Sequence, residues 1–477
     1  MRRKVVLVEV NEVPFEIWDR YATKRPKSAV ARLLKESVQR TTVTEDEGFV
    51  SRGTKHTYPQ LTPWCTWPTL HRGVPNTSHT ILDIGQDLTG PNTEFPPIWE
   101  IAADAGRRVG VCGSLHSSPI PNQPKNYAFY IPDPFAMSSE TIPSDFEAFQ
   151  AFSLGATQAS GRNVDSGIDA NRAIRAVLSL PRLGLRPSTV TRIVRQLLSE
   201  RRTPERVVRR RVIQTELNYD LFRKALKQEQ PDLSLFFSNH VAAAMHRYWA
   251  AAYPNDFDGA DVDADWVDAY GGEIDHAMDS IDAILDDLLT FCDENRQFDL
   301  MVLSSMGQAP TRLKRVTHEL GVVDPNLLMA SLGAPQDSWR WTNAMAPNFN
   351  VFVDEPYLET VIERLDDMLI DDEPIDYRRA PNGFVSMDFG QQNLHHPKVT
   401  LDGVTASAGT FGLQNVEIQD LSMKCADHIP QGSWFTWSPD SGPDASRSEV
   451  SSCTVAPTVL RALGLPLPEY MREPVTV

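Results

Sequence analysis

Short apolar runs, each ending in polar residues, recur along the chain with helical patterns between them. The runs occupy Lys4–Val10, Arg107–Gly113, Asp232–Phe237 and Phe298–Leu303. A continuous apolar run of this length is typical of a strand that is covered on both faces, as in a parallel sheet. Helical spacing appears, for example, at Phe15–Tyr21 and Pro97–Ala105. This alternation predicts an α/β fold with a mixed, mostly parallel sheet and helices on both faces.

Length and charge exclude several classes of protein. The chain has 477 residues, too many for one small core, and a net charge of −17, which argues against binding to a nucleic acid polymer. No apolar run approaches the ~20 residues that span a membrane, and the run after Met1 is too short and too charged for a secretory signal. The five cysteines are scattered and form no CxxC pair, so reduced thiols and a cytoplasmic location are expected.

The middle of the chain differs in composition from both ends. We expect the first part of a sheet domain over 1–160, a helical, arginine-rich cap insertion over 161–230, and the second part of the sheet domain over 231–477. Most of these arginines are expected on a solvated helix face; the alternative is that they grip an anionic substrate with guanidinium forks. They are Arg192, Arg195, Arg201, Arg202, Arg206, Arg209, Arg210 and Arg211.

The segment Leu61–His79 (LTPWCTWPTLHRGVPNTSH) contains the candidate nucleophiles. Its prolines exclude a central strand and allow a short helix to begin at either of them. A hydroxyl just before such a helix lies among free backbone N–H groups, which favour an anion such as phosphate. Thr62 and Thr66 are the candidates for the attacking hydroxyl, and His71 or His79 for an adjacent base. The alternative is a tight, aromatic-rich surface loop.

Polar side chains lie at the ends of three predicted strands. Ligands of open α/β sheets bind beyond the carboxyl ends of the strands, so these positions are placed for function, with a plain polar strand exit as the alternative. Two histidines after one strand favour a metal or phosphate site. The residues are Glu9, Asn11 and Glu12 in the first strand end, Asn239, His240, His246 and Arg247 in the third, and Ser305 and Gln308 in the fourth.

Several segments together resemble the alkaline phosphatase superfamily, in its type I phosphodiesterase/nucleotide pyrophosphatase branch. The matching pieces span nearly the whole chain: VVLVEVNE, TPWCTWPTLHRGVPNTSHTI, PPIWEIAADAGRRVGVCG, DLSLFFSNHVAAAMHRYW, LMVLSSMGQ, HIPQGSWFTW and VAPTVLRALGLPLPEYM. The IWE…AG piece and the terminal helix are the most specific, and they concern the fold. The resemblance implies an alkaline-phosphatase-like sheet, a threonine nucleophile and two divalent ions, with His428 as the last metal ligand.

The metal motifs depart from the family pattern. Asn11 stands where the family has an Asp, Ser305-Met306 replace an Asp-His pair, and Ala242 replaces the Asp four residues before His246. An amide, a hydroxyl and a thioether hold a hard dication less well than carboxylates do. We therefore expect one ion site to be lost.

The ligands that remain imply at most one divalent ion, Zn or Mn, and leave open a protein without metal. Glu9 or Glu12 is able to replace the missing charge. The candidate ligands are Asn11, Asn239, His240, His246 and His428.

Three functions are consistent with these residues, and the substrate and oligomeric state stay open. The first is a hydrolase or transferase acting on a phosphoester, phosphodiester, nucleotide-sugar or glycan phosphate, with Thr62, Thr66 and His79 as catalytic candidates. The second is a binding or accessory protein on the same scaffold that recognises an anionic ligand without turnover. The third is a metal-free transferase that uses Glu9 or Glu12 with the histidines in acid–base roles. Side chains expected at the substrate are Glu9, Glu12, Arg247, Ser305 and Gln308.

Overall fold

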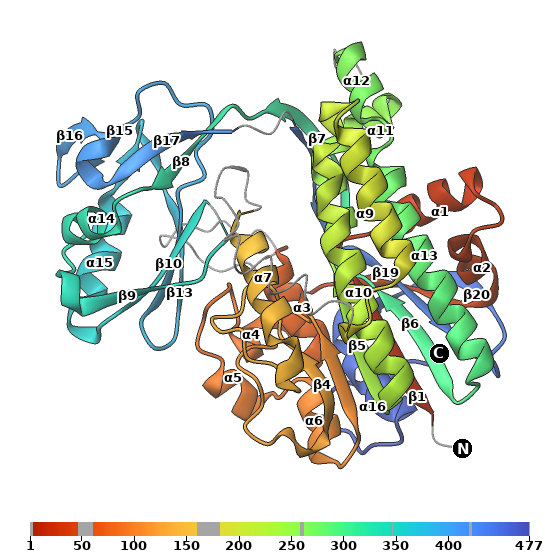
Figure 1. Cartoon of the computed structure of the whole chain (residues 1–477). Coiled ribbons are helices and arrows are strands. Elements are labelled where there is room, and N and C mark those ends of the chain that lie inside the picture. Colours follow the sequence, from red (N-terminus) through yellow and green to blue (C-terminus); the bar gives the residue numbers. More distant parts are fainter. Residues whose placement is uncertain are drawn as a thin grey trace.

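An eight-stranded sheet runs through the centre of the molecule (Figure 1), in the order β20-β2-β19-β6-β1-β5-β3-β4. The structure is a computed structural model, and it describes residues 3–45, 61–159, 182–257, 262–345, 347–418 and 422–476. β19 is antiparallel to both of its neighbours, and the other pairs are parallel. The predicted mixed, mostly parallel sheet is therefore confirmed. The strands are β1 Lys4–Val10, β2 Val38–Val43, β3 Val109–Cys112, β4 Tyr127–Ile131, β5 Leu233–Ser238, β6 Phe298–Leu303, β19 Gln431–Trp437 and β20 Asp444–Ser451.

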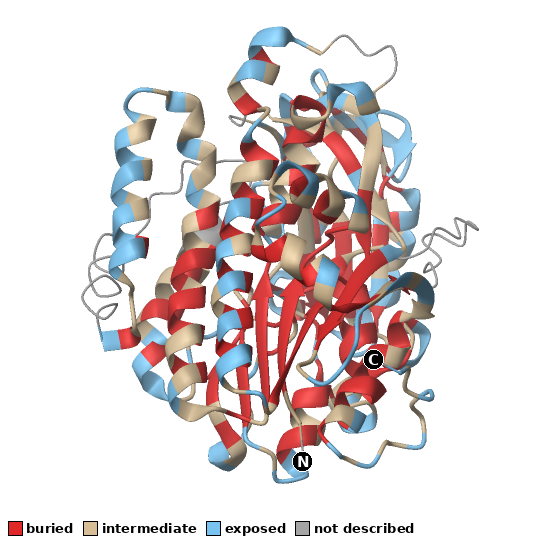
Figure 2. Ribbon diagram, turned by 90° about the vertical axis from the view of Figure 1, so that its right-hand side faces the viewer, coloured by how far each residue is buried: buried red, intermediate tan, exposed pale blue. Residues whose placement is uncertain are grey.

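Helices cover both faces of this sheet because its central strands are apolar on both sides. In β1, Val5 and Leu7 join one core, and Val6 and Val8 join the core on the opposite face. Figure 2 shows the strands buried between the helices. The first face is covered by α3 Pro63–Arg72, α6 Ile98–Asp104 and α16 Val455–Ala462; the second by α1 Phe15–Lys24, α2 Ala29–Glu36, α10 Arg210–Glu229, α11 His240–Ala252 and α13 Glu273–Glu294.

Residues 318–417, called the small lobe below, form separate small sheets with their own apolar core, beside the central sheet in Figure 1. An antiparallel ribbon of β7 Gly307–Arg315 and β18 Met423–Ile429 connects the lobe to the central sheet. The main elements of the lobe are β8 His318–Val322, α14 Pro325–Ser331, β9 Trp339–Thr342, β10 Asn348–Val353, α15 Glu355–Asp367, β13 Asp376–Ala380, β14 Phe384–Asp388, β15 Lys398–Leu401, β16 Val404–Ser407 and β17 Leu413–Glu417.

Asp83 connects the small lobe to the sheet domain. Its carboxylate is 1% exposed, and Oδ2 accepts hydrogen bonds from Ser386 Oγ at 2.7 Å and Arg378 Nη1 at 3.0 Å. Cys65 of α3 packs in one apolar cluster with Phe352 and other residues of the lobe. The lobe is thus held against the segment that contains the candidate threonines.

One predicted helix is wrong in extent. The pattern over Trp266–Phe291 predicts a single helix, but the chain forms α12, Ala264–Tyr270, and then α13. The break falls at Gly271, where a Cβ would stand 3.1 Å from the carbonyl oxygen of Ala251. The close approach of α11 therefore requires a glycine, and the apolar spacing does not reveal such an approach.

The structure describes only part of the predicted cap insertion over 161–230. Residues 160–181 lie outside the described residues, and the described remainder is helical: α9 Pro187–Glu200, the 3₁₀ helix η3 Pro204–Arg209, and α10. α10 contributes Phe222 and Leu226 to the core under the sheet, whereas α9 exposes apolar side chains. The domain boundaries stay a prediction. None of the described helices combines the length and the apolar composition that crossing a bilayer requires.

Candidate functional site

The ends of β1, β5 and β6 meet at one edge of the sheet, because the three strands are parallel neighbours. Asn11 and Glu12 follow β1, Asn239 follows β5, and Ser305 follows β6. Glu12 has a φ of 62°, in the left-handed region that non-glycine residues rarely adopt outside tight turns and functional sites. The turn after β1 thus directs a buried carboxylate into the space beyond the sheet.

Glu12, His246 and His428 form what we call the acid–imidazole cluster. His246 lies in α11 and His428 in β18. Glu12 Oε2 is 2.9 Å from His246 Nε2 and 3.2 Å from His428 Nε2. Glu12 is 3% exposed, while the side chains of His246 and His428 are 31% and 21% exposed. The carboxylate is therefore buried, whereas the two imidazoles that contact it are partly exposed.

Backbone carbonyls determine which ring nitrogens face the cluster. Nδ1 of His246 donates to the oxygen of Ala426 at 3.0 Å, and Nδ1 of His428 donates to the oxygen of Leu61 at 2.6 Å. Both Nε2 atoms therefore face Glu12, and they lie 3.2 Å from each other. Two inward nitrogens and a carboxylate at this separation require a shared cation, either a proton or a metal ion.

Without a metal ion, a proton on an imidazole is the group that can supply this positive charge. Burial raises the pKa of Glu12, but His428 and His246 outweigh burial and hold this pKa well below its ordinary value. Burial lowers the pKa of His428, but the Glu12 carboxylate outweighs it, and the net shift of this pKa is upward. Both shifts favour a carboxylate paired with an imidazolium in the metal-free cluster.

The same donor set fits one divalent ion. The three ligand atoms lie within 4.8 Å of one another. Two imidazoles and a carboxylate are a frequent ligand set of catalytic zinc, which keeps a further position for water or substrate. Asn11 Nδ2 and Gln308 Nε2 donate to the two oxygens of Glu12, as supporting groups of metal ligands do. The residues present thus fit a single-ion site.

Thr62 lies directly beside this cluster. It is the N-cap of α3, which begins at Pro63 as one of the two predicted starts, and the preceding carbonyl, of Leu61, holds His428. The hydroxyl of Thr62 is buried and has no hydrogen-bond partner among the described residues. A hydroxyl at a helix start that bonds to none of the described residues is placed to contact a bound anion.

Thr66 and Asn11 are already bonded within the protein. Thr66 Oγ1 and Ser305 Oγ, both 0% exposed, lie 2.8 Å apart. Asn11 accepts from Trp67 Nε1 at 2.8 Å and donates to Glu12 and to Asn239. Its oxygen therefore faces an indole N–H instead of an ion. The hydrogen bonds of Asn11 and Ser305 thus hold the strand ends together.

The histidines and glutamate behind α3 face away from the acid–imidazole cluster. His79 is 0% exposed; its Nδ1 accepts from the amide of Ile81, so Nε2 carries the proton and donates to Thr69 at 2.9 Å. Burial holds the pKa of His79 well below its ordinary value. Glu9 and His71 pair at 2.6 Å and are 0% and 1% exposed. Neither pair bonds to Thr62 or Thr66.

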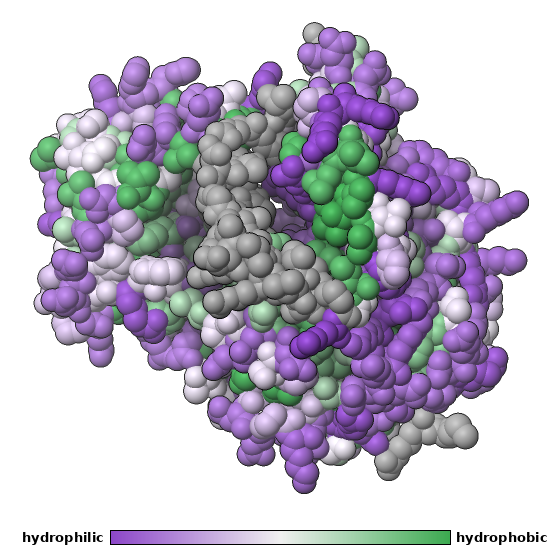
Figure 3. Space-filling view, viewed as in Figure 1, coloured by the Kyte–Doolittle hydropathy of each residue, from purple (hydrophilic) through white to green (hydrophobic). Residues whose placement is uncertain are grey.

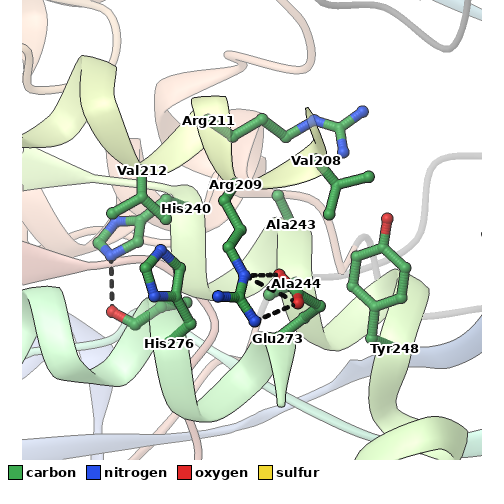
Figure 4. A pocket seen from close by; sticks show the side chains of 11 residues that line it. Val208, Arg209, Arg211, Val212, His240, Ala243, Ala244, Tyr248, Glu273 and His276 are labelled. Atoms are coloured by element: carbon green, nitrogen blue, oxygen red, sulfur yellow. Dashed lines mark hydrogen bonds and ion pairs between the residues drawn. The ribbon is translucent and has the colours of Figure 1, made fainter. Parts of the chain in front are cut away.

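His240 follows β5 like its neighbours but faces the layer between α11 and α13. Its Nε2 donates to the oxygen of Ala277 at 2.9 Å and its Nδ1 bonds Ser238 Oγ at 2.7 Å. Figure 4 shows it beside His276 in a small pocket with the Arg209–Glu273 ion pair. Burial lowers the pKa of His240 to about 4. Both ring nitrogens are thus occupied, and the structure does not bring His240 to His246.

The remaining candidates lie around the cluster in supporting positions. Gln308 is 1% exposed and contacts Glu12 and the oxygen of Ala242, so it holds the carboxylate. Arg247 donates to the oxygen of Ala243 on its own helix at 3.0 Å. The carbonyls of Leu61 and Ala426, which orient the imidazoles, carry no sequence signal because any residue supplies a carbonyl.

No family model and no curated protein matches the sequence. Solved structures that are similar include murine ectonucleotide pyrophosphatase/phosphodiesterase 5, with a TM-score of 0.42, 12% identity and 98% coverage of both chains. The human protein of that name has a TM-score of 0.43 and 12% identity, and the match covers 98% of this chain and 97% of the other. Phosphonoacetate hydrolase from Sinorhizobium meliloti 1021, in complex with phosphonoformate, has a TM-score of 0.41 and 12% identity, with 97% of this chain and 95% of the other covered.

At these values the similarity assigns no activity and no residue role to this chain.

Proposed function

We propose that the chain is a hydrolase or transferase of phosphoesters or phosphodiesters that uses one divalent ion, Zn or Mn, and Thr62 as the nucleophile. Glu12, His246 and His428 would hold the ion. The observation that carries the proposal is the buried hydroxyl of Thr62 at the start of α3, which has no hydrogen-bond partner in the described part of the chain and lies one residue from the carbonyl that orients His428. Nucleotides, nucleotide-sugars and glycan phosphates are the substrate classes considered.

The protein's own residues prepare this site for an anionic phosphoryl group. The N-terminus of α3 carries partial positive charge, which favours a phosphate oxygen next to Thr62. Gln308 and Asn11 stabilise Glu12 as an anion, and the two backbone carbonyls keep both Nε2 atoms directed inward. A divalent ion supplies Lewis-acid polarisation of a phosphoryl oxygen and lowers the pKa of a neighbouring hydroxyl or water.

The test is turnover of a panel of phosphate mono- and diesters, nucleotides and nucleotide-sugars by the metal-loaded protein. Loss of the nucleophile in Thr62→Ala is expected to lower kcat by about 10³-fold or more, while Thr62→Ser retains part of it. Thr66→Ala is the matched control; it removes a buried bond to Ser305 and is expected to cost stability with a much smaller loss of kcat. Equal rates for wild type and Thr62→Ala would refute the role of Thr62.

A second candidate is a binding or accessory protein that recognises an anionic ligand without turnover. It is favoured by Asn11 and Ser305, which the resemblance places at metal positions of the family and which, like Thr66, have hydrogen-bond partners within the protein. Under this proposal, isothermal titration detects binding of a phosphate ester that the protein never converts in the presence of Zn or Mn. Turnover that depends on Thr62 excludes it.

A further inference from the structure

Helix α9 exposes an apolar strip. Val190, Val194, Leu197 and Leu198 recur at the spacing of one helical face and are 42%, 50%, 46% and 54% exposed, and Val207 in η3 is 42% exposed. Figure 3 shows the strip as a continuous green surface bordered by purple side chains. Of the twelve large apolar side chains that are exposed in the described part of the chain, these are five. An apolar patch of this kind marks an interaction surface.

The strip lies in the most basic part of an acidic protein. Residues 182–211 contain ten arginines and two glutamates, with no lysine or aspartate, whereas the whole chain has a net charge of −17. Several of these arginines are paired, as in the Arg192–Glu216 and Arg210–Glu200 ion pairs. Others are exposed and form no ion pair with a described residue: Arg195, Arg201 and Arg202.

The arginines that pair with none of the described residues lie next to the apolar side chains. Around the helix axis, Arg201 falls within the apolar face, and Arg195 and Arg202 fall on the flank beside Leu198, because successive residues are about 100° apart. A helix with an apolar face bordered by arginines is the pattern of segments that lie in a membrane interface.

We propose that α9 binds the surface of an anionic lipid bilayer. The apolar strip would enter the boundary between headgroups and acyl chains, and Arg195, Arg201 and Arg202 would contact lipid phosphates. A second copy of the chain is a poorer occupant, because a symmetric contact through this face would bring the same arginines together. The acidic remainder of the surface is repelled by such a bilayer, so the charge distribution selects this one face.

The proposal is tested by co-sedimentation of the full chain with vesicles of phosphatidylcholine, with and without phosphatidylglycerol. Wild type is expected to sediment with the anionic vesicles only. Val194→Asp/Leu198→Asp is expected to lose at least about tenfold in the partition coefficient. The matched control is Val323→Asp/Val404→Asp, at positions 53% and 63% exposed in the small lobe, and it is expected to bind like wild type.

Three outcomes overturn the proposal. The first is failure of wild type to sediment with anionic vesicles, and the second is an equal loss in both double variants. The third is retention on poly-glutamate that the α9 substitutions abolish, without vesicle binding, which assigns the patch to an acidic protein. Sedimentation velocity detects self-association in the same samples. Because the readout is binding to lipid, the result is independent of the proposed catalytic activity.

Discussion

Replacing Glu12 by glutamine tests whether the acid–imidazole cluster is an ion site. The substitution keeps the size of the side chain and removes the one negative charge among the three ligand groups. Glu12 is 3% exposed and its Oε2 lies within 3.2 Å of both Nε2 atoms. In Glu12→Gln we therefore expect both imidazoles to remain while the affinity for a divalent ion falls sharply.

The size of the effect follows from linkage. Loss of a supporting partner of a metal ligand costs about 10- to 100-fold in affinity, so we take about 100-fold as a lower bound for a direct ligand. At an ion concentration about 100 times the wild-type Kd, binding stabilises the wild type by about 2.7 kcal/mol. At the same ion concentration the variant, whose Kd is taken as about 100-fold higher, is about half saturated and gains only about 0.4 kcal/mol. The expected difference is about 2.3 kcal/mol.

The assay is denaturant unfolding of each protein with Zn or Mn and again after chelation. Each protein is its own reference, so the intrinsic cost of Glu12→Gln cancels. The matched control is Glu94→Gln, an exposed glutamate on α5, Thr89–Glu94, which should gain as much from the ion as wild type does. Equal ion-induced stabilisation of wild type and Glu12→Gln would refute the assignment of Glu12, and a wild type that takes up no ion would refute the ion site itself.

Three further predictions concern the scaffold. Burial raises the pKa of Glu100 from 4.5 to about 7 in the folded protein, so its contribution to stability is present below pH ~4.5 and is lost as the pH rises through about 7. In denaturant unfolding, Glu100→Gln should therefore be more stable than wild type by about 3 kcal/mol near pH ~8, and this advantage should be absent below pH ~4.5. Arg378→Met leaves the Asp83 carboxylate buried without its cation, so it should lower the free energy of unfolding by about 3–5 kcal/mol and speed proteolysis of the small lobe. If both quantities stayed unchanged, Asp83 would not connect the lobe to the sheet domain. The five cysteines are buried, and burial raises the pKa of Cys112 to about 12, so a thiol reagent should label the native protein only as fast as it unfolds, and immediate labelling would contradict this burial.

The sequence predicts the scaffold well because its signals are local. Continuous apolar runs indicate buried strands, and β6 spans the same residues as the predicted run, Phe298–Leu303. The proline at the start of α3 and the glycine at its end, Gly73 with a φ of 69°, are also local signals. They are enough to place Thr62 before a helix and His246 beyond a strand.

Helical geometry explains why His240 and His246 face different ways, although both follow the same strand. His240 and His246 both follow β5, but six residues of helix separate their directions by about 240° around α11. His240 therefore faces α13 through Ala277, and His246 faces β18 through Ala426. Helical geometry predicts that the two rings diverge, whereas it does not say which of them meets Glu12.

Only the tertiary structure decides which histidines contact Glu12. His428 reaches the cluster because β18 pairs with β7 and sets it opposite Gln308, and Glu12 reaches it through a left-handed turn after β1. Contacts between segments so distant in the chain depend on how sheet, ribbon and helix pack together, which no local pattern encodes. The sequence alone thus determined a sheet with polar strand ends and a threonine before a helix, and packing decided that a glutamate and two particular histidines face one another.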